Sequence, residues 1–161
     1  MLALNKQAVP SMNIIFDLNG ALFNTLQDAH GKNTQAIKLT HHIHIMRLLH
    51  DCLTHGNRLF AVSQWSQSLY EFMSDVPHIK QILNLFDDIV LLETVGYAST
   101  DSRVFEHLIT KHRLDPRRCI VVNDSPLHLD AARQVGAARN IICTTVNVTK
   151  VRQELEHHGA L

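Results

Sequence analysis

Three polar residues stand at the ends of short apolar runs, where they could do chemistry. They are Asp17 after Asn13–Phe16, Ser63 after Arg58–Val62, and Asp124 shortly after Cys119–Val122. Apolar runs of this length, with β-branched residues, are typical of buried strands. Because open α/β sheets bind ligands at the carboxyl ends of their strands, a carboxylate there is a candidate catalytic group or metal ligand. The same residues could instead be ordinary turn or helix-capping residues.

The elements that must position these residues alternate between strand and helix. Two further strands are predicted at Ile89–Leu92 and Asn140–Thr144. The spacing of apolar residues predicts helices over His41–His55, Trp65–Phe72, His78–Leu85, Ser102–His112, Pro126–Val135 and Val148–His158. This alternation predicts an α/β fold with a parallel sheet and right-handed crossovers.

Several helical residues are expected to face the core. In the first predicted helix, one face carries Ile43, Met46, either Leu49 or His50, and Leu53. In the second, Trp65, Leu69 and Phe72 are interpreted as core residues. In the fourth, Val104, Phe105 and Leu108 are expected to point inward.

Composition narrows the class of protein. The chain has 161 residues, which predicts a single domain over 1–161. Its formal net charge is +0, so general electrostatic attraction to nucleic acid or an anionic membrane is not expected. The three cysteines cannot all pair, and we interpret them as buried thiols of a cytoplasmic protein. The cluster at His41, His42 and His44 is interpreted as a solvated face, because no further metal ligand follows it at a suitable spacing.

Three segments together carry a resemblance to the haloacid dehalogenase (HAD)-like hydrolase superfamily. Segment 17–22 reads Asp-Leu-Asn-Gly-Ala-Leu and resembles the first motif, Asp-x-Asp-Gly-Thr-Leu/Val. Segment 60–63 resembles the second, an apolar strand ending in Ser or Thr. Segment 121–126 reads Val-Val-Asn-Asp-Ser-Pro and resembles the fourth, a strand ending in Gly/Asp-Asp-Ser. The order of the three segments and the spacing between them fit the family pattern, and the resemblance runs from about Met12 almost to the C-terminus.

The resemblance implies a three-layer, Rossmann-like domain with a five-stranded parallel core sheet in the order 3-2-1-4-5. Residues 1–11 would be a loose N-terminal extension. The family often inserts a cap domain after the first motif, but here the polar segment 25–40 is too short for one. We therefore expect a capless or minimally capped domain with a short loop at 25–40.

The resemblance also implies roles for the polar residues, because this strand order brings Asp17, Ser63 and Asp124 to one edge. Asp17 would be the nucleophile that forms an aspartyl-phosphate and also a Mg²⁺ ligand. Asp124 and the backbone carbonyl of Asn19 would complete the protein ligands, with Asn19 also at the phosphate. Ser63 would hydrogen-bond the transferred phosphoryl group. The two carboxylates would repel each other, and a divalent cation would remove this repulsion. Because carboxylates supply hard oxygen ligands, the expected cation is Mg²⁺.

The chain departs from the family pattern at three places. Asn19 replaces the second Asp, which in the family protonates the leaving group and activates water, and an amide cannot exchange a proton in that way. Ser99 aligns with the family lysine, and His128 with the acid that helps to hold that lysine. We interpret His128 as a surface residue or one behind the site. Arg103 is a candidate replacement for the missing positive charge.

Two functions therefore remain open. The first is a slow or specialised phosphatase-type hydrolase that uses Asp17 and Mg²⁺ on a small phosphorylated molecule. A substrate with a good leaving group, such as an acyl phosphate, would need less help from an acid. The second is a catalytically inactive protein of the same fold that binds an anionic ligand or regulates a partner.

Overall fold

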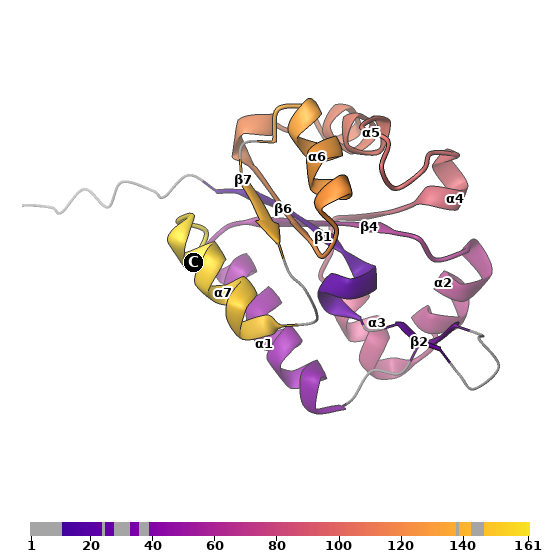
Figure 1. Ribbon diagram of the computed structural model, residues 1–161. Coiled ribbons are helices and arrows are strands. Elements are labelled where there is room, and N and C mark those ends of the chain that lie inside the picture. The colour runs from indigo at the N-terminus through magenta and orange to yellow at the C-terminus, as the bar shows by residue number, and fades with distance from the viewer. Residues whose placement is uncertain (1–10, 24, 28–32, 36–38, 138, 143–146) are drawn as a thin grey trace, which may run out of the picture.

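The centre of the protein is a parallel sheet. The structure is a computed structural model that describes residues 11–23, 25–27, 33–35, 39–137, 139–142 and 147–161. Five strands form the sheet: β1 (Asn13–Asp17), β4 (Arg58–Ser63), β5 (Asp88–Leu91), β6 (Cys119–Asn123) and β7 (Arg139–Ile142). Their order is β5-β4-β1-β6-β7, and every neighbouring pair is parallel (Figure 1). The predicted order 3-2-1-4 of the first four core strands is confirmed by β5-β4-β1-β6, and β7 lies beside β6. Residues 143 and 144 of the predicted fifth strand lie outside the described residues.

Helices cover both faces of this sheet. They are α1 (Leu39–Thr54), α2 (Gln67–Ser74), α3 (Pro77–Leu83), α4 (Leu92–Val95), α5 (Arg103–His112), α6 (Pro126–Gln134) and α7 (Val148–His157). Figure 1 shows α5 and α6 on one face and α1, α3 and α7 on the other. A short 3₁₀ helix, η2 (Pro116–Arg118), leads into β6. No helix of the described residues is long and apolar enough to cross a membrane.

The central strand β1 is buried on both faces. Ile14 and Phe16 belong to the core on the side of α1, α3 and α7, whereas Ile15 belongs to the core on the side of α5 and α6. Successive side chains of a strand point to opposite faces, so a strand covered by helices on both sides must be apolar throughout. The unbroken run Ile-Ile-Phe before Asp17 thus places that carboxylate at the end of the most buried part of the sheet.

Two predictions about helix faces were wrong. Phe72 is 67% exposed, whereas Met73 of the same helix is buried, so the apolar face of α2 is turned by one residue from the predicted one. Ile43 is 61% exposed because the buried face of α1 is centred on Ile45, Leu48 and Cys52, together with Leu49, one of the two residues predicted at its position. The predicted stripe with Met46 and Leu53 lies beside this face, and both residues pack against the core at its margin. Trp65, Val104, Phe105 and Leu108 are buried as predicted.

The polar segment after the first motif contains regular structure. Strands β2 (Thr25–Gln27) and β3 (Asn33–Gln35) pair in antiparallel fashion where a loop was predicted, and α1 already begins at Leu39. The N-terminal residues 1–10 lie outside the described part of the chain. The division into a single domain stays a prediction.

Candidate active site

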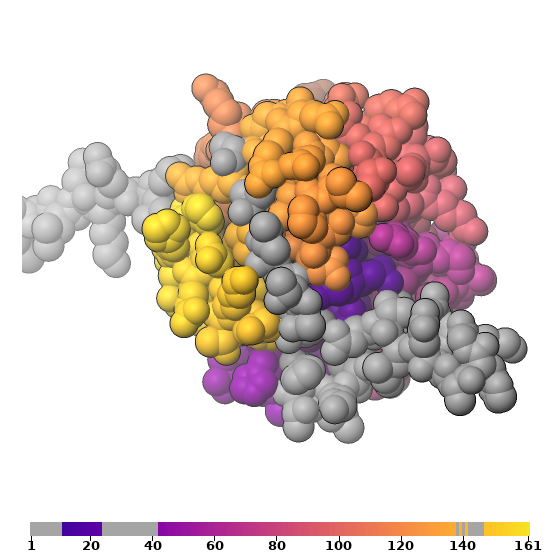
Figure 2. Space-filling model, viewed as in Figure 1, coloured from indigo at the N-terminus to yellow at the C-terminus, as the bar shows by residue number. Residues whose placement is uncertain are grey.

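Asp17 is the last residue of β1 and lies at the carboxyl edge of the sheet. It is only 6% exposed. Its strand runs between β4 and β6, with Asp17 opposite Val62 in the β4 register. The ends of β4 and β6 therefore flank this carboxylate, as the sequence predicted. Figure 2 shows the turn after β1, in indigo, at the surface between the orange segment of β6 and α6 and a magenta part of the chain.

Two hydrogen bonds and one nearby imidazole surround the Asp17 carboxylate. The backbone N–H of Asn19 donates to Oδ1 over 3.0 Å. The side chain of Asn123, the last residue of β6, also hydrogen-bonds Asp17. Nδ1 of His128 lies 3.9 Å from Oδ2. These contacts hold the carboxylate in one orientation, which a nucleophile needs for in-line attack.

Burial nevertheless dominates the protonation of Asp17. Desolvation, together with the negative charge of Asp124, raises the pKa of Asp17 from 3.8 to about 7, against the lowering effect of its hydrogen bonds to Asn19 and Asn123. No lysine or arginine of the described residues is among the groups that shift this pKa. Shifts of this size in a crevice mark candidate functional residues.

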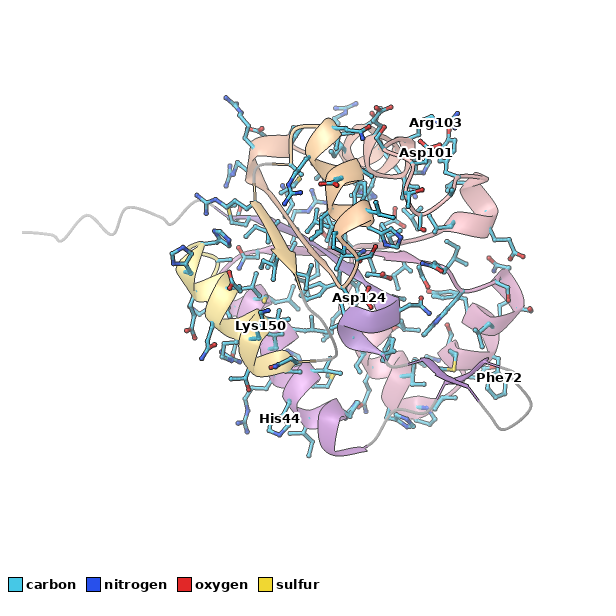
Figure 3. The ribbon with its side chains drawn as sticks, in the orientation of Figure 1. His44, Phe72, Asp101, Arg103, Asp124 and Lys150 are labelled. Atoms are coloured by element: carbon cyan, nitrogen blue, oxygen red, sulfur yellow. The ribbon has the colours of Figure 1, made fainter. Side chains whose placement is uncertain are left out.

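Asp124 is brought to Asp17 by the turn that follows β1. Gly20 has φ +91°, and a Cβ placed there would lie 2.2 Å from Oδ2 of Asp124. Only glycine fits, because any side chain would both strain the backbone and displace the carboxylate. Figure 3 shows Asp124 beside this turn. Asp17 and Asp124 therefore lie at the same edge of the sheet, as predicted, because the turn after β1 contacts the residue that follows β6.

Ser63 is completely buried and already has two partners. Its hydroxyl donates to Oδ1 of Asn19 over 3.2 Å and accepts from the backbone N–H of Trp65 over 3.1 Å. The same Asn19 oxygen also accepts from the backbone N–H of Gln64 over 3.4 Å. The Asn19 side chain is thus bonded to the end of β4. The roles of Ser63 and Asn19 at a phosphoryl group stay predictions.

The residues at the three departures from the family pattern lie near Asp17. Ser99 and His128 line one narrow crevice together with Asp17 and Asn123. Its free volume is about 10 Å³, room for at most about one water molecule. His128 was predicted as a surface residue or one behind the site, but its side chain is only 12% exposed and lies against Asp17. Burial lowers the pKa of this imidazole, against the raising effect of Asp124.

The suggestion that Arg103 replaces the missing lysine was wrong. Its guanidinium pairs with Asp101 over 2.5 Å and lies 4.7 Å from the ring centroid of Tyr97. Figure 3 shows Arg103 and Asp101 together, well apart from Asp124. An arginine two residues after an aspartate at a helix start bonds that neighbour more readily than it reaches across the sheet edge.

Asn123 is a site residue that the sequence reasoning missed. It is 5% exposed, and its Oδ1 accepts from the backbone N–H of Ser125 over 2.8 Å, which fixes the side chain beside Asp17. A polar residue closing an otherwise apolar strand was the available signal, because a buried amide needs partners.

The arrangement fits a divalent cation with few protein ligands. Among the described residues, no group of three or more His, Cys, Asp or Glu side chains is placed to hold a metal ion. The negative charge of Asp124 raises the pKa of Asp17 at this edge, and Mg²⁺ commonly binds through one or two carboxylates with water completing its shell. The histidine cluster does not compete, since His42 hydrogen-bonds the backbone oxygen of His78 and His44 is exposed.

A larger hollow lies elsewhere. It measures about 750 Å³ and follows the open edge of β5, with Tyr70, Tyr97 and Lys111 in its wall. Neither Asp17 nor Asp124 lines it. Its charged groups are paired, since Lys111 contacts Asp88 over 2.8 Å, so the paired carboxylates remain the better candidate for chemistry.

Comparison with known proteins identifies the fold. No protein-family model matches the sequence, and no match is found among curated proteins. Among solved structures, a hydrolase from Streptococcus pneumoniae TIGR4 matches with a TM-score of 0.66 at 16% identity, over 91% of this chain and 98% of that one. A predicted HAD-like family hydrolase from Porphyromonas gingivalis matches with a TM-score of 0.64 at 15% identity, over 82% and 90%.

A third structure is a 3-deoxy-D-manno-octulosonate 8-phosphate phosphatase from Moraxella catarrhalis, in complex with magnesium, phosphate and KDO. It matches with a TM-score of 0.60 at 14% identity, over 92% of this chain and 88% of that one. At such identities the likeness shows the fold alone. The chain therefore has the fold of the HAD-like hydrolases, as the sequence motifs predicted.

Proposed function

We propose that this chain, built on the HAD-like fold, is a slow phosphatase-type hydrolase that transfers a phosphoryl group to Asp17. The observation that carries the proposal is the meeting of Asp17 and Asp124 at one sheet edge, with the Asp124 carboxylate against the glycine of the turn after β1. The phosphatase relative that binds magnesium and phosphate supports the same class of chemistry. The substrate would be a small phosphorylated molecule.

Each residue of the site has a task in this proposal. Asp17 attacks phosphorus, while Asn19 and Asn123 keep its carboxylate oriented through the hydrogen bonds described above. Asp17, Asp124 and the backbone carbonyl of Asn19 would hold Mg²⁺. The ion would neutralise the negative charge of the phosphoryl group. Ser63 would exchange its bond with Asn19 for one to a phosphoryl oxygen.

The proposed activity is slow because Asn19 provides no proton. General acid–base catalysis is typically worth about 10²–10⁴-fold, and Asn19 replaces the group that would supply it. The free thiols Cys52 and Cys119 are buried, which supports the cytoplasmic location that completes the proposal.

The test restores the missing groups. Asn19→Asp, Ser99→Lys and His128→Asp together should give Mg²⁺-dependent activity on an aryl phosphate well above that of the native chain. Their effects should not multiply, since the three groups share one site. Adding Asp17→Asn should abolish the gain, because no aspartyl-phosphate could form. Native activity that survives Asp17→Asn would place the chemistry on another residue.

Titration calorimetry gives a second test. Mg²⁺ binding should be weak and should fall in both Asp17→Asn and Asp124→Asn, because each change removes a hard oxygen ligand. Unchanged affinity in both variants would refute the metal assignment.

The alternative function is a binding or regulatory protein without turnover. It is favoured by the narrow crevice of about 10 Å³ beside Asp17 and by the engagement of the Ser63 hydroxyl with Asn19. A well-folded triple variant with no activity would support this alternative.

A further inference from the structure

We propose that Asp17 is a phosphoryl acceptor whose aspartyl-phosphate persists, and that its phosphoryl donors are acyl phosphates. The inference rests on the proposed function, since it requires Asp17 to be the nucleophile, and it adds the donor class and the fate of the intermediate. It is carried by the hydrogen bonds of the Asn19 side chain and by the position of His128. The two half-reactions make different demands on these residues.

The first half-reaction needs no proton when the donor is an acyl phosphate. An Asp17 oxygen attacks phosphorus, the bond from phosphorus to the acyl oxygen breaks, and its electron pair leaves with the acyl group as a carboxylate. The carboxylic acid formed by protonating this leaving group has a pKa of about 4, so the carboxylate departs without a proton at neutral pH. An alkoxide leaving group would need the acid that Asn19 cannot provide. The site therefore discriminates between donors by the basicity of the leaving group.

The second half-reaction does need a base. Water attacks phosphorus, gives up a proton, and the Asp17 carboxylate leaves. Oδ1 of Asn19 already accepts from the Ser63 hydroxyl and from the backbone N–H of Gln64. An amide oxygen is not a base and cannot take the proton, whether Ser63 keeps this bond or exchanges it for one to a phosphoryl oxygen. The bond from Gln64 still holds the amide at the end of β4, so Asn19 provides no base for hydrolysis.

His128 does not replace the missing base, because it lies on the wrong side of the phosphoryl group. The attacking and leaving oxygens are roughly in line across phosphorus. In hydrolysis Asp17 is the leaving group, so the attacking water lies beyond phosphorus, on the side away from Asp17. His128 instead contacts the Asp17 carboxylate itself, with Nδ1 3.9 Å from Oδ2. It can orient the acceptor, but it does not reach the water.

Phosphorylation and hydrolysis therefore have separate requirements here. The first uses the oriented carboxylate of Asp17. The second needs a base beside the attacking water, and the other carboxylate of the site, Asp124, would be bound to Mg²⁺ in the proposed function.

The experiment follows the phosphoryl group on the full-length chain. The protein is incubated with acetyl phosphate and Mg²⁺, freed of excess donor by rapid desalting, and analysed by intact-mass spectrometry over time. We expect an adduct of one phosphoryl group that is absent in Asp17→Asn. Its decay should accelerate about 10²-fold or more in Asn19→Asp, a change of similar side-chain size that restores a carboxylate.

A second measurement does not depend on the folding of any variant. Part of the native phosphorylated protein is unfolded in guanidinium chloride after the donor has been removed, and the decay of its adduct is compared with that in the folded protein. The folded protein should lose its phosphoryl group no faster than the unfolded chain. Decay more than about 10²-fold faster in the folded state would show base catalysis and overturn the inference.

The remaining outcomes separate the two proposals. Rapid Asp17-dependent release of phosphate without accumulation of an adduct would overturn the persistent intermediate and leave the proposed hydrolase standing. An adduct that survives about 10²-fold longer in His128→Asn than in the native chain would identify His128 as the base and would also overturn the inference. Neither adduct nor phosphate release, in a native chain that is folded by circular dichroism, would refute the proposed function and this inference together.

Discussion

The burial of Asp17 should reduce stability at neutral pH, and Asp17→Asn should remove that cost. The pKa of Asp17 is about 7 in the folded protein and 3.8 as the ordinary value, a difference of about three pH units. Each unit corresponds to about 1.4 kcal/mol, so ionising this buried carboxyl costs about 4 kcal/mol. Between these two pKa values the folded state keeps a proton that the unfolded chain releases. The contribution of Asp17 to the free energy of unfolding is therefore highest below pH 3.8 and falls as the pH rises towards 7.

The assay is urea unfolding in the presence of a chelator, followed by the fluorescence of Trp65. This residue is the single tryptophan, is buried, and stacks on Phe23 with ring centroids 5.4 Å apart. The amide of Asp17→Asn does not titrate. The unfolding free energy of the variant minus that of the native chain should therefore grow by about 4 kcal/mol between pH 4 and pH 8. Taking this difference cancels the titration of those histidines that lie away from Asp17, whereas His128 is close enough to add a contribution of its own.

The control is Asp101, an aspartate whose pKa is shifted in the opposite direction from that of Asp17. Hydrogen bonds from Arg103 hold the pKa of Asp101 below its usual range, so its contribution to stability is present at neutral pH and lost as the pH falls. Asp101→Asn should therefore reverse the direction of the pH dependence. A difference between Asp17→Asn and the native chain that stays constant from pH 4 to pH 8 would refute the argument from burial.

Three further predictions concern the frame around the site. Gly20→Ala should lower the free energy of unfolding in urea by about 2 kcal/mol or more and abolish Mg²⁺ binding, because its Cβ would lie 2.2 Å from Oδ2 of Asp124. The control is Gly96→Ala, which should only strain the backbone, since Gly96 has φ +72° and no atom within 4 Å of the added Cβ. Asn57→Ala should cost about 3 kcal/mol by urea unfolding, since the buried amide makes three hydrogen bonds that join α1, the residue before β1 and the C-terminal segment. Burial raises the pKa of Cys52 to about 12 and that of Cys119 to about 11, so peptide mapping after alkylation at pH 8 should find both thiols unmodified until the protein unfolds.

The sheet and its active edge could be predicted because their signals are local. The run before Asp17 is apolar at every position, as a strand buried on both faces requires, and Gly20 marks the turn that only a glycine allows. The helix faces were harder. In α2 the apolar residues Leu69, Phe72 and Met73 permit two neighbouring phases, and the packing of the helix against α3 helps to decide which one is buried.

The side-chain partners at the site could not be predicted, because they depend on contacts between distant segments. Ser63 and Asn19 are 44 residues apart, and their hydrogen bond follows from the pairing of β1 with β4. His128 looks like a surface residue on the first turn of a helix until the neighbouring strand is known to end in Asp17. Arg103 carries a charge that suits the missing lysine, but an aspartate two residues away binds it first.

The absence of a nearby cation among the described residues explains why Asp17 is protonated so easily. An ammonium group at position 99 would favour the ionised form of Asp17 and lower its pKa. The structure has the neutral Ser99 in that crevice, and desolvation then raises the pKa of Asp17 to about 7. At neutral pH about half of the carboxyl groups are therefore protonated and can act neither as nucleophile nor as metal ligand. A cation held by Asp17 and Asp124 would favour the ionised form of Asp17, so the proposed cation binding would raise the share of chains that are ready to accept a phosphoryl group.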